Sequence, residues 1–322
     1  MKRDSAIAAA AGILGGVLLV AAWHGSVLGI ILGMMFSPLP MAMTVFGLGL
    51  AYLPVAIVGG AMAVAVLTGS VALAAFYLAF DAVPIVVLAR MGLAAERQRI
   101  SSVPGTAQRL EGQAIAIPVV ALTMMAAAIM GVGLASYSAG SGGLEASLAA
   151  RLTQMADESG MLRELPEAAR KSMLEAVARV LPGAAAWNWS VRALASAVIG
   201  QALLTREGLA RWPTPAYRTI AVPGWYVGVF WVAVVAAWLT PGDAGFIIAN
   251  GAMVLCLPLV LQGLAVVHCA AARFGFGRLA LIAFYGLSLV AAGPAIVLVV
   301  TLGVMEHFSQ MRRRMDAARN GG

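Results

Sequence analysis

The sequence predicts an all-α fold, a polytopic membrane helix bundle with about eight transmembrane helices. Three observations support this prediction: 61% of the 322 residues are hydrophobic and only 11% are charged, the mean hydropathy is +0.92, and apolar segments occur along nearly the whole chain. Soluble domains contain about 45–50% apolar and about 25% charged residues. A soluble fold of this composition would expose large apolar patches and aggregate, whereas lipid accommodates such a surface.

Seven apolar segments are long enough to cross the hydrocarbon core, which takes roughly 20 helical residues. We therefore expect one integral membrane domain, residues 1–322, with an extramembrane insertion at residues 138–182. The seven segments are Ala6–Trp23, Val71–Leu88, Ala114–Leu134, Ala184–Leu204, Val222–Leu239, Phe246–Ala271 and Leu279–Val304.

A further apolar region, Val27–Leu67, is interrupted by Ser37-Pro38-Leu39-Pro40 and by Pro54. Proline ends or kinks a helix because it lacks an N–H group and its ring clashes with the preceding turn. We expect a short helix, a break at the SPLP segment, and then one long or two short helices. Non-helical backbone at membrane depth must be buried in protein or line a cavity, so the break is either an interfacial turn or part of a pocket.

The N-terminus, Met1-Lys2-Arg3 followed by an apolar run, resembles a signal peptide. Ala21-Ala22-Trp23 is a poor cleavage site and further apolar segments follow at once, so we expect a retained first helix. Cys256 and Cys269 lie in apolar segments without ligand or CxxC spacing. They are expected to be buried thiols, not a disulfide or a zinc site.

The net charge is +7, and the basic residues lie between the apolar segments and at both chain ends. This distribution is typical of orientation signals and lipid headgroup contacts, and nucleic-acid binding is not expected. The N-terminus and two loops are predicted to be cytoplasmic. The C-terminal tail should be cytoplasmic too, but three crossings after Arg218 would place it outside, so one span must be miscounted. The basic residues concerned are Lys2, Arg3, Arg90, Arg97, Arg99, Arg109, Arg206, Arg211, Arg218, Arg312, Arg313, Arg314 and Arg319.

The segment Leu144–Leu181 combines apolar residues at helical spacing with charged residues between them. This pattern predicts two amphipathic helices on the non-cytoplasmic side, the second beginning at Pro166-Glu167. They either cap the bundle or form a plain surface hairpin.

Asp81 lies several residues from either end of its apolar segment and precedes Pro84. A carboxylate there costs several kcal/mol unless it is paired, neutral or hydrated. It is predicted either to bind a cation, a proton or a polar ligand group, or to bond backbone groups freed by Pro84 or lie shallow enough to meet water. Arg192, near the start of its helix, is expected to extend its side chain to the interface, and pairing with Asp81 is the alternative.

Three further polar residues, Asn250, Gln262 and His268, complete the predicted ligand-binding set with Asp81. The alternative for the amides is hydrogen bonding between helices, worth roughly 1 kcal/mol each. The three histidines of the chain are scattered, so no metal site is predicted. No common hydrolase or nucleotide motif occurs, and neither catalytic residues nor a cofactor are predicted.

Small residues recur at a spacing of four on the first two helices, at Ala6 and Ala10 and at Gly29 and Gly33. Small residues let helices approach closely in a membrane, where no hydrophobic force drives their association. The two pairs are predicted to serve either ordinary packing or the docking of a membrane-protein partner.

Motifs near both ends of the chain carry a family resemblance. In the C-terminal third, Gln262-Gly263-Leu264-Ala265 precedes an arginine run, with conspicuous residues between them at His268, Tyr285, Pro294, Gly303 and Glu306. Near the N-terminus, FSPLPMAMTVFGLG covers residues 36–49. With these motifs the chain resembles the YybS-like family of uncharacterised bacterial membrane proteins.

The resemblance implies a multi-pass protein of the bacterial inner membrane with unknown activity. Such proteins are distantly similar to the S components of energy-coupling-factor vitamin transporters and to rod-shape membrane proteins. In S components a small-xxx-small face of the first helix docks the coupling subunit, and Ala6 and Ala10 match this spacing. The resemblance implies no particular substrate.

Two function hypotheses follow. The first is a small-molecule-binding, transporter-like subunit with a pocket among the SPLP break, Asp81 and the Gln262 helix. The second is a non-catalytic scaffold of a cell-envelope assembly, which contacts its partners through the amphipathic helices and the glycine faces. A cavity lined by Asp81, Gln262 or Asn250 would favour the first hypothesis. A tightly filled bundle with an apolar groove would favour the second.

Overall fold

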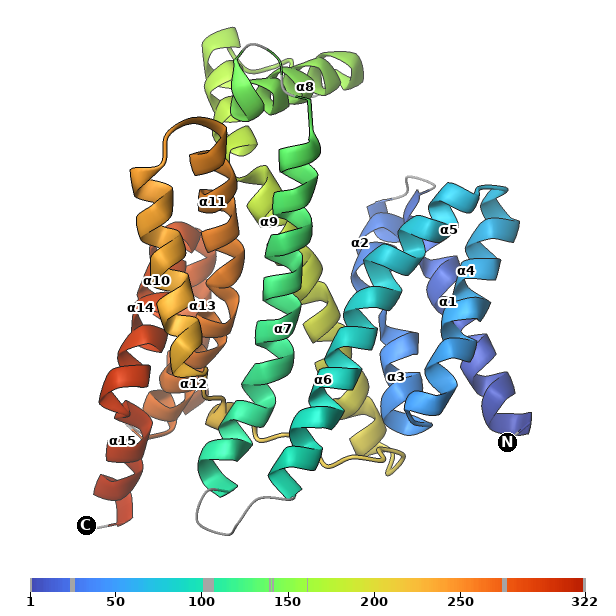
Figure 1. Ribbon diagram of the computed structural model, residues 1–322, viewed down its shortest axis with the longest axis vertical. Coiled ribbons are helices and arrows are strands. Elements are labelled where there is room, and N and C mark those ends of the chain that lie inside the picture. The colour runs from blue at the N-terminus through green and yellow to red at the C-terminus, as the bar shows by residue number, and fades with distance from the viewer. Residues whose placement is uncertain are drawn as a thin grey trace. The chain divides into compact units, whose positions relative to one another are not determined.

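The computed structural model describes residues 2–23, 27–100, 107–138, 140, 142–160, 162–273 and 277–320. Within these ranges every regular element is a helix, which confirms the predicted all-α class (Figure 1). The helices are α1 (Lys2–Trp23), α2 (Val27–Phe36), α3 (Leu39–Gly47), η1 (Leu50–Tyr52), α4 (Leu53–Thr68), α5 (Val71–Tyr77), η2 (Leu78–Ala82), α6 (Val83–Ile100), α7 (Ala107–Ser136), α8 (Gly143–Ser159), α9 (Glu167–Arg206), η3 (Tyr217–Thr219), α10 (Gly224–Leu239), α11 (Gly242–Leu255), α12 (Leu257–Arg273), α13 (Gly277–Val290), α14 (Ala292–Ser309) and α15 (Met311–Asn320).

Six helical segments of the described chain are long and apolar enough to cross a membrane. Two shorter apolar helices, α10 and α13, add to them. The membrane bundle is therefore confirmed, although six rather than eight helices meet the length of a full crossing. The six segments are Lys2–Ala22, Leu50–Thr68, Val71–Arg97, Gly112–Ser136, Gly242–Arg273 and Ala292–Ser309.

The chain folds into two compact units. The first combines Met1–Leu122 with Trp189–Ile220, and the second combines Thr123–Asn188 with Ala221–Gly322. The helices α7 and α9 each contribute residues to both units, because the boundaries at Leu122 and Trp189 fall inside them.

In the first unit, α1 and α4 pack backbone against backbone through small residues. A Cβ atom at Gly12 would overlap the carbonyl oxygen of Ala56, and one at Gly16 would lie 2.6 Å from the carbonyl oxygen of Gly60. Glycine and alanine at a spacing of four on both helices allow this approach, as is common between membrane helices. The small residues of the first helix thus serve packing inside the unit on this face.

The predicted break at the SPLP segment is present. Helix α2 ends at Phe36, and α3 begins at Leu39. Ser37 is fully buried and Pro38 is also buried, so the turn lies inside protein rather than exposed at an interface. Burial speaks against the interfacial turn, and the segment does not line the cleft that the structure describes, so its role in a pocket stays a prediction. After α3, Gly49 with φ 105° leads into η1, and Pro54 lies in the first turn of α4.

In the second unit, α8 and the start of α9 coincide with the two predicted amphipathic helices, and α9 begins directly after Pro166. The Leu144 N–H donates to Asp243 at 2.7 Å, which docks α8 on the start of α11. The prediction of a separate second helix is wrong, because α9 continues through Pro182 and includes the predicted span Ala184–Leu204. Proline inside a helix kinks it without ending it when other groups satisfy the freed backbone.

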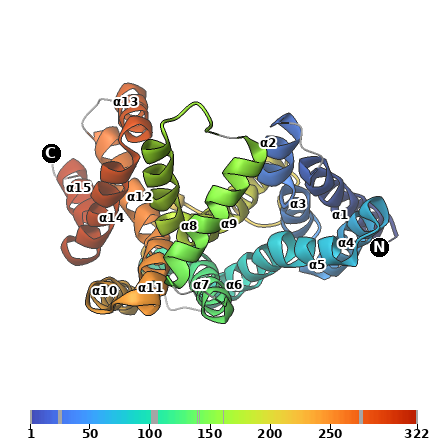
Figure 2. The ribbon, with the colours of Figure 1, turned by 90° about the horizontal axis from the view of Figure 1, so that it is seen from above.

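Two other predicted spans are each divided into two helices. The span Phe246–Ala271 breaks at Cys256, just before Pro258, and the span Leu279–Val304 breaks at Ala291, shortly before Pro294. The helices α10 and α11 form a hairpin and lie side by side in both views (Figure 1 and Figure 2). Proline at positions 258 and 294 explains why neither apolar run is one straight helix.

The break at Ala291 resolves the miscounted span. His307, near the end of α14, approaches Gly224 at the start of α10, since a Cβ there would be 3.1 Å from the imidazole ring. The arginine run that follows α14 therefore starts at the end of the second unit where α10 begins. Residues 279–304 do not form a single crossing to the opposite end.

Candidate functional site

Asp81 and Arg192 form a buried ion pair in the first unit. The Arg192 Nη2 lies 2.6 Å from the Asp81 Oδ1, and the two side chains are 1% and 0% exposed. Asp81 lies in η2, a short π-helical stretch between α5 and α6 that widens the helix just before Pro84. The expectation that Arg192 extends to the interface is wrong, because the available carboxylate offers a better partner within the protein than the membrane surface.

Arg192 also satisfies backbone groups that two prolines leave unpaired. Its Nη2 donates to the Phe80 carbonyl at 2.8 Å, and its Nη1 donates to the Met34 carbonyl at 2.8 Å. These carbonyls lie four residues before Pro84 and Pro38, and each would have accepted the N–H that proline lacks. Trp189 adds a second donor to the Phe80 carbonyl at 2.9 Å. One arginine therefore joins both proline-interrupted helices to α9.

Arg192 makes two further contacts, whereas one atom of each residue in the pair has no hydrogen-bond partner in the described part of the chain. The Arg192 Nη1 lies 3.3 Å from the Ser37 hydroxyl, and the guanidinium lies 3.9 Å from the centroid of the Phe80 ring. The Asp81 Oδ2 and the Arg192 Nε are buried without a hydrogen-bond partner among the described residues. A cation at Asp81 would have to displace Arg192, whereas Oδ2 could still accept a proton or a donor group. The ligand role of Asp81 stays a prediction confined to that atom.

Asn250 bridges α11 to the kinked part of α9 in the second unit. Its Oδ1 accepts the Gly183 N–H at 2.8 Å, and its Nδ2 donates to the Arg179 carbonyl at 3.1 Å. Gly183 and Arg179 are four residues apart, so the amide spans one turn of α9 beside Pro182. A third bond, to the Phe246 carbonyl at 3.0 Å, leaves little hydrogen-bonding capacity for a ligand.

Gln262 connects three segments of the second unit. It accepts the Val222 N–H at 2.6 Å and donates to the Gly303 carbonyl at 2.6 Å. The helices α12 and α14 touch backbone to backbone here, since a Cβ at Gly263 would overlap the carbonyl oxygen of Val299. The predicted amide is therefore an interhelical hydrogen-bonding residue at a close crossing.

The other conspicuous C-terminal residues also pair with one another. His268 lies 2.9 Å from the Tyr285 hydroxyl, and Glu306 forms an ion pair with Arg312 at 2.8 Å. Among the described residues no group of three or more potential ligands could hold a metal ion. Within the second unit, His268 does not join Asn250 and Gln262 in any contact that the structure describes.

The predicted set of ligand residues is thus divided. Asp81 belongs to the first unit, whereas Asn250, Gln262 and His268 belong to the second. Each is engaged by polar groups of its own unit. The pairing of Arg192 with Asp81 is one of the two alternatives that the sequence leaves open, and no spacing in the sequence could decide it, because the two residues are 111 positions apart.

The predicted docking residues differ in how far they are exposed. Gly33 packs inside the first unit, because a Cβ there would overlap the Leu18 carbonyl oxygen, so it is not an exposed docking residue. Gly29 is half-buried. Ala6 and Ala10 are exposed on α1, and Ile13 continues this face at 47% exposure. Only the α1 face remains available to a partner.

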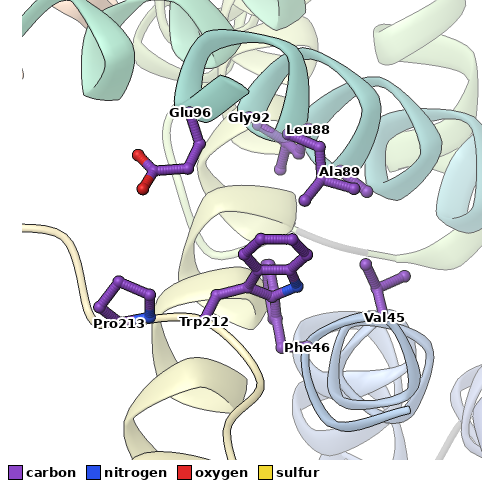
Figure 3. Close-up of a pocket in the computed structure, with 9 residues that line it drawn as sticks. Val45, Phe46, Leu88, Ala89, Gly92, Glu96, Trp212 and Pro213 are labelled. Atoms are coloured by element: carbon purple, nitrogen blue, oxygen red, sulfur yellow. The ribbon is translucent and has the colours of Figure 1, made fainter. Parts of the chain in front are cut away.

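A small open cleft of about 100 Å³ lies in the first unit between α3, α6 and the segment after α9. Figure 3 shows the Trp212 indole beside Phe46, with Leu88 and Ala89 across from it and the Glu96 carboxylate at one end. Three bonds fix the Trp212 segment: Gln201 donates to the Trp212 carbonyl at 2.8 Å, and Arg211 donates its N–H to the Phe46 carbonyl at 2.9 Å and its guanidinium to the Leu48 carbonyl. Sequence reasoning missed this cleft, because its lining residues are ordinary apolar ones far apart in the chain.

Comparison with known proteins adds a family but no activity. A family model described as predicted membrane protein (DUF2232) matches residues 14–306. No curated protein and no solved structure matches the chain. The family match covers both units, including the Asp81–Arg192 pair and the Gln262 crossing. The chain therefore belongs to the predicted membrane protein family DUF2232.

Proposed function

We propose that this protein is a non-catalytic membrane scaffold of a bacterial cell-envelope assembly, inserted in the inner membrane with its N-terminus in the cytoplasm. The observation that carries the proposal is the use of the intramembrane polar residues. Asp81 pairs with Arg192, and Asn250 and Gln262 bond backbone groups of other helices, each within its own unit. None of them lines the cleft beside Trp212, whose walls are mainly apolar.

A small-molecule-binding subunit would need polar groups directed into a cavity to orient its substrate. Buried side chains that already bond backbone groups hold helices in place, and breaking those bonds to bind a ligand would leave buried groups unsatisfied. The scaffold hypothesis is therefore better supported than the transporter hypothesis.

The surface proposed for that partner is the exposed face of α1 that contains Ala6 and Ala10. A photoreactive amino acid placed at Ala10 should yield one discrete protein adduct in cells. The matched control is Val66 on α4 of the same unit, which is 78% exposed and should crosslink only to lipid. Equal adduct patterns at Ala10 and Val66 would overturn the proposal.

Mass spectrometric identification of the adduct decides between the two roles. An envelope-assembly protein supports the scaffold. A transporter coupling subunit would refute the scaffold and support the relation to S components.

A further inference from the structure

We propose that the cleft beside Trp212 binds one acyl chain of an anionic phospholipid, whose headgroup lies among the arginines around the end of α6. This inference is independent of the scaffold role, because it concerns a different surface of the first unit. Its starting point is the polarity of the cleft along α6.

The cleft follows α6 from an apolar end to a charged end. Leu88 and Ala89 are buried at one end, and Glu96 lies two turns further along the helix at the other. Eight helical residues separate Leu88 from Glu96, about 12 Å along the axis. All of these residues fall in the last part of the candidate span Val71–Arg97, where a helix passes from the hydrocarbon core to the headgroup region. A lipid molecule has the same gradient from acyl chain to headgroup.

The walls of the cleft suit an acyl chain. Val45 and Phe46 come from α3, Gly92 removes side-chain bulk from α6, and the Trp212 indole covers the opposite side (Figure 3). Tryptophan is also favoured at headgroup depth, where its ring contacts chains and its N–H reaches polar groups.

The charge at this end of the unit favours an anionic headgroup. The segments 90–97 and 206–218, which contain or border the cleft, carry five arginines against two acidic residues, Glu96 and Glu207. Basic residues at a membrane surface attract anionic lipids. Glu96 interacts with another group, so its carboxylate is not an isolated negative charge at the charged end of the cleft. The five arginines are all exposed: Arg90, Arg97, Arg206, Arg211 and Arg218.

Fluorescence quenching by brominated lipids tests the proposal. The full chain is reconstituted in phosphatidylcholine vesicles that contain increasing fractions of phosphatidylglycerol with brominated acyl chains. The emission of Trp212 is obtained as the difference between the wild type and Trp212→Phe. The matched reference is Trp238, which is 85% exposed on α10 and is isolated by Trp238→Phe. Trp212 should be half-quenched at a mole fraction of brominated phosphatidylglycerol about fivefold lower than Trp238 needs.

Two further measurements separate a specific site from general lipid contact. Gly92→Leu should fill the cleft and remove the preference of Trp212 for the brominated lipid, since only Pro118 lies near a Cβ at this position, at 3.8 Å. In vesicles where phosphatidylcholine is the only brominated lipid, Trp212 and Trp238 should be quenched at equal mole fractions of it. Equal quenching of the two tryptophans by brominated phosphatidylglycerol, or an equal preference with both headgroups, would overturn the proposal.

Discussion

At the scale of single residues, Arg192 is the most constrained side chain of the first unit. It neutralises Asp81 and donates to the carbonyls of Met34 and Phe80, which two prolines leave without their helical partners. Unsatisfied backbone groups cost several kcal/mol each in a membrane, because no water is present to replace the lost bond. A residue that bonds two such carbonyls and one buried carboxylate supports the geometry of α2, α3 and α6 together.

Arg192→Met should therefore be strongly destabilising. Removing one partner of a buried ion pair costs about 3–5 kcal/mol, because the remaining charge is left uncompensated. Asp81→Asn should cost less, since the amide oxygen still accepts from Arg192. The free energy of unfolding in mixed micelles titrated with a denaturing detergent measures both effects.

The matched control for this comparison is Arg206→Met, at the exposed end of the same helix α9. It should leave the free energy of unfolding nearly unchanged, as surface substitutions do. If Arg192→Met lowers the free energy of unfolding no more than Arg206→Met does, the buried pair does not support the fold.

At the scale of elements, the closest helix contacts are made by glycines. Gly12 and Gly16 of α1 meet α4, and Gly263 and Gly303 join α12 to α14. The same close backbone approach occurs in both units, and in the second unit Gln262 also donates to the Gly303 carbonyl across the interface. Close backbone approach and side-chain hydrogen bonds together replace the hydrophobic force that is missing between helices in lipid.

Gly12→Ala tests this packing against a matched substitution. A Cβ at Gly12 overlaps the backbone of Ala56, so α1 and α4 must separate, and overpacking of this kind costs about 1–3 kcal/mol. Gly133→Ala on α7 has open space around the new Cβ and should stabilise the helix by up to about 1 kcal/mol. Thermal unfolding in detergent should shift in opposite directions for the two variants. Shifts of the same sign and size would contradict the backbone contact between α1 and α4.

At the scale of the whole molecule, an orientation in the membrane is predicted from the basic loops and from the path of the second unit. The loop between α8 and α9 is predicted to be non-cytoplasmic, and the loop after α9 cytoplasmic. The return of α14 to the start of α10 places the C-terminal arginines at the end of the second unit where α10 begins, directly after the loop predicted to be cytoplasmic. We therefore predict that the C-terminal tail is cytoplasmic as well.

Alkaline phosphatase fusions test this topology in cells. A fusion after Gly160 should be active, and fusions after Gly208 and at the C-terminus should be inactive, because the enzyme matures only outside the cytoplasm. A fluorescent protein at the C-terminus serves as the complementary control and should be bright. An inactive fusion after Gly160 or an active one at the C-terminus would contradict the assigned orientation.

The sequence by itself determined the fold class, most helical segments and the break at the SPLP segment. Apolar runs of this length require lipid, and two prolines within three residues end a helix. It failed where a proline kinks rather than ends a helix, as at Pro182, and where an apolar run contains two helices, as at Ala291. In both cases the outcome depends on whether another segment satisfies the freed backbone.

Only the tertiary structure decided which side chain bonds the backbone groups beside each proline. Arg192 serves the carbonyls beside Pro38 and Pro84, Asn250 bridges α9 beside Pro182, and Gln262 bonds α14. The sequence identified Asp81, Asn250 and Gln262 as unusual because polar groups are costly in lipid. It could not assign their partners, which lie 40 to 111 residues away along the chain. The free-energy cost of burying a polar side chain can be estimated from that residue alone. The hydrogen bonds that offset this cost depend on which other helices pack beside it.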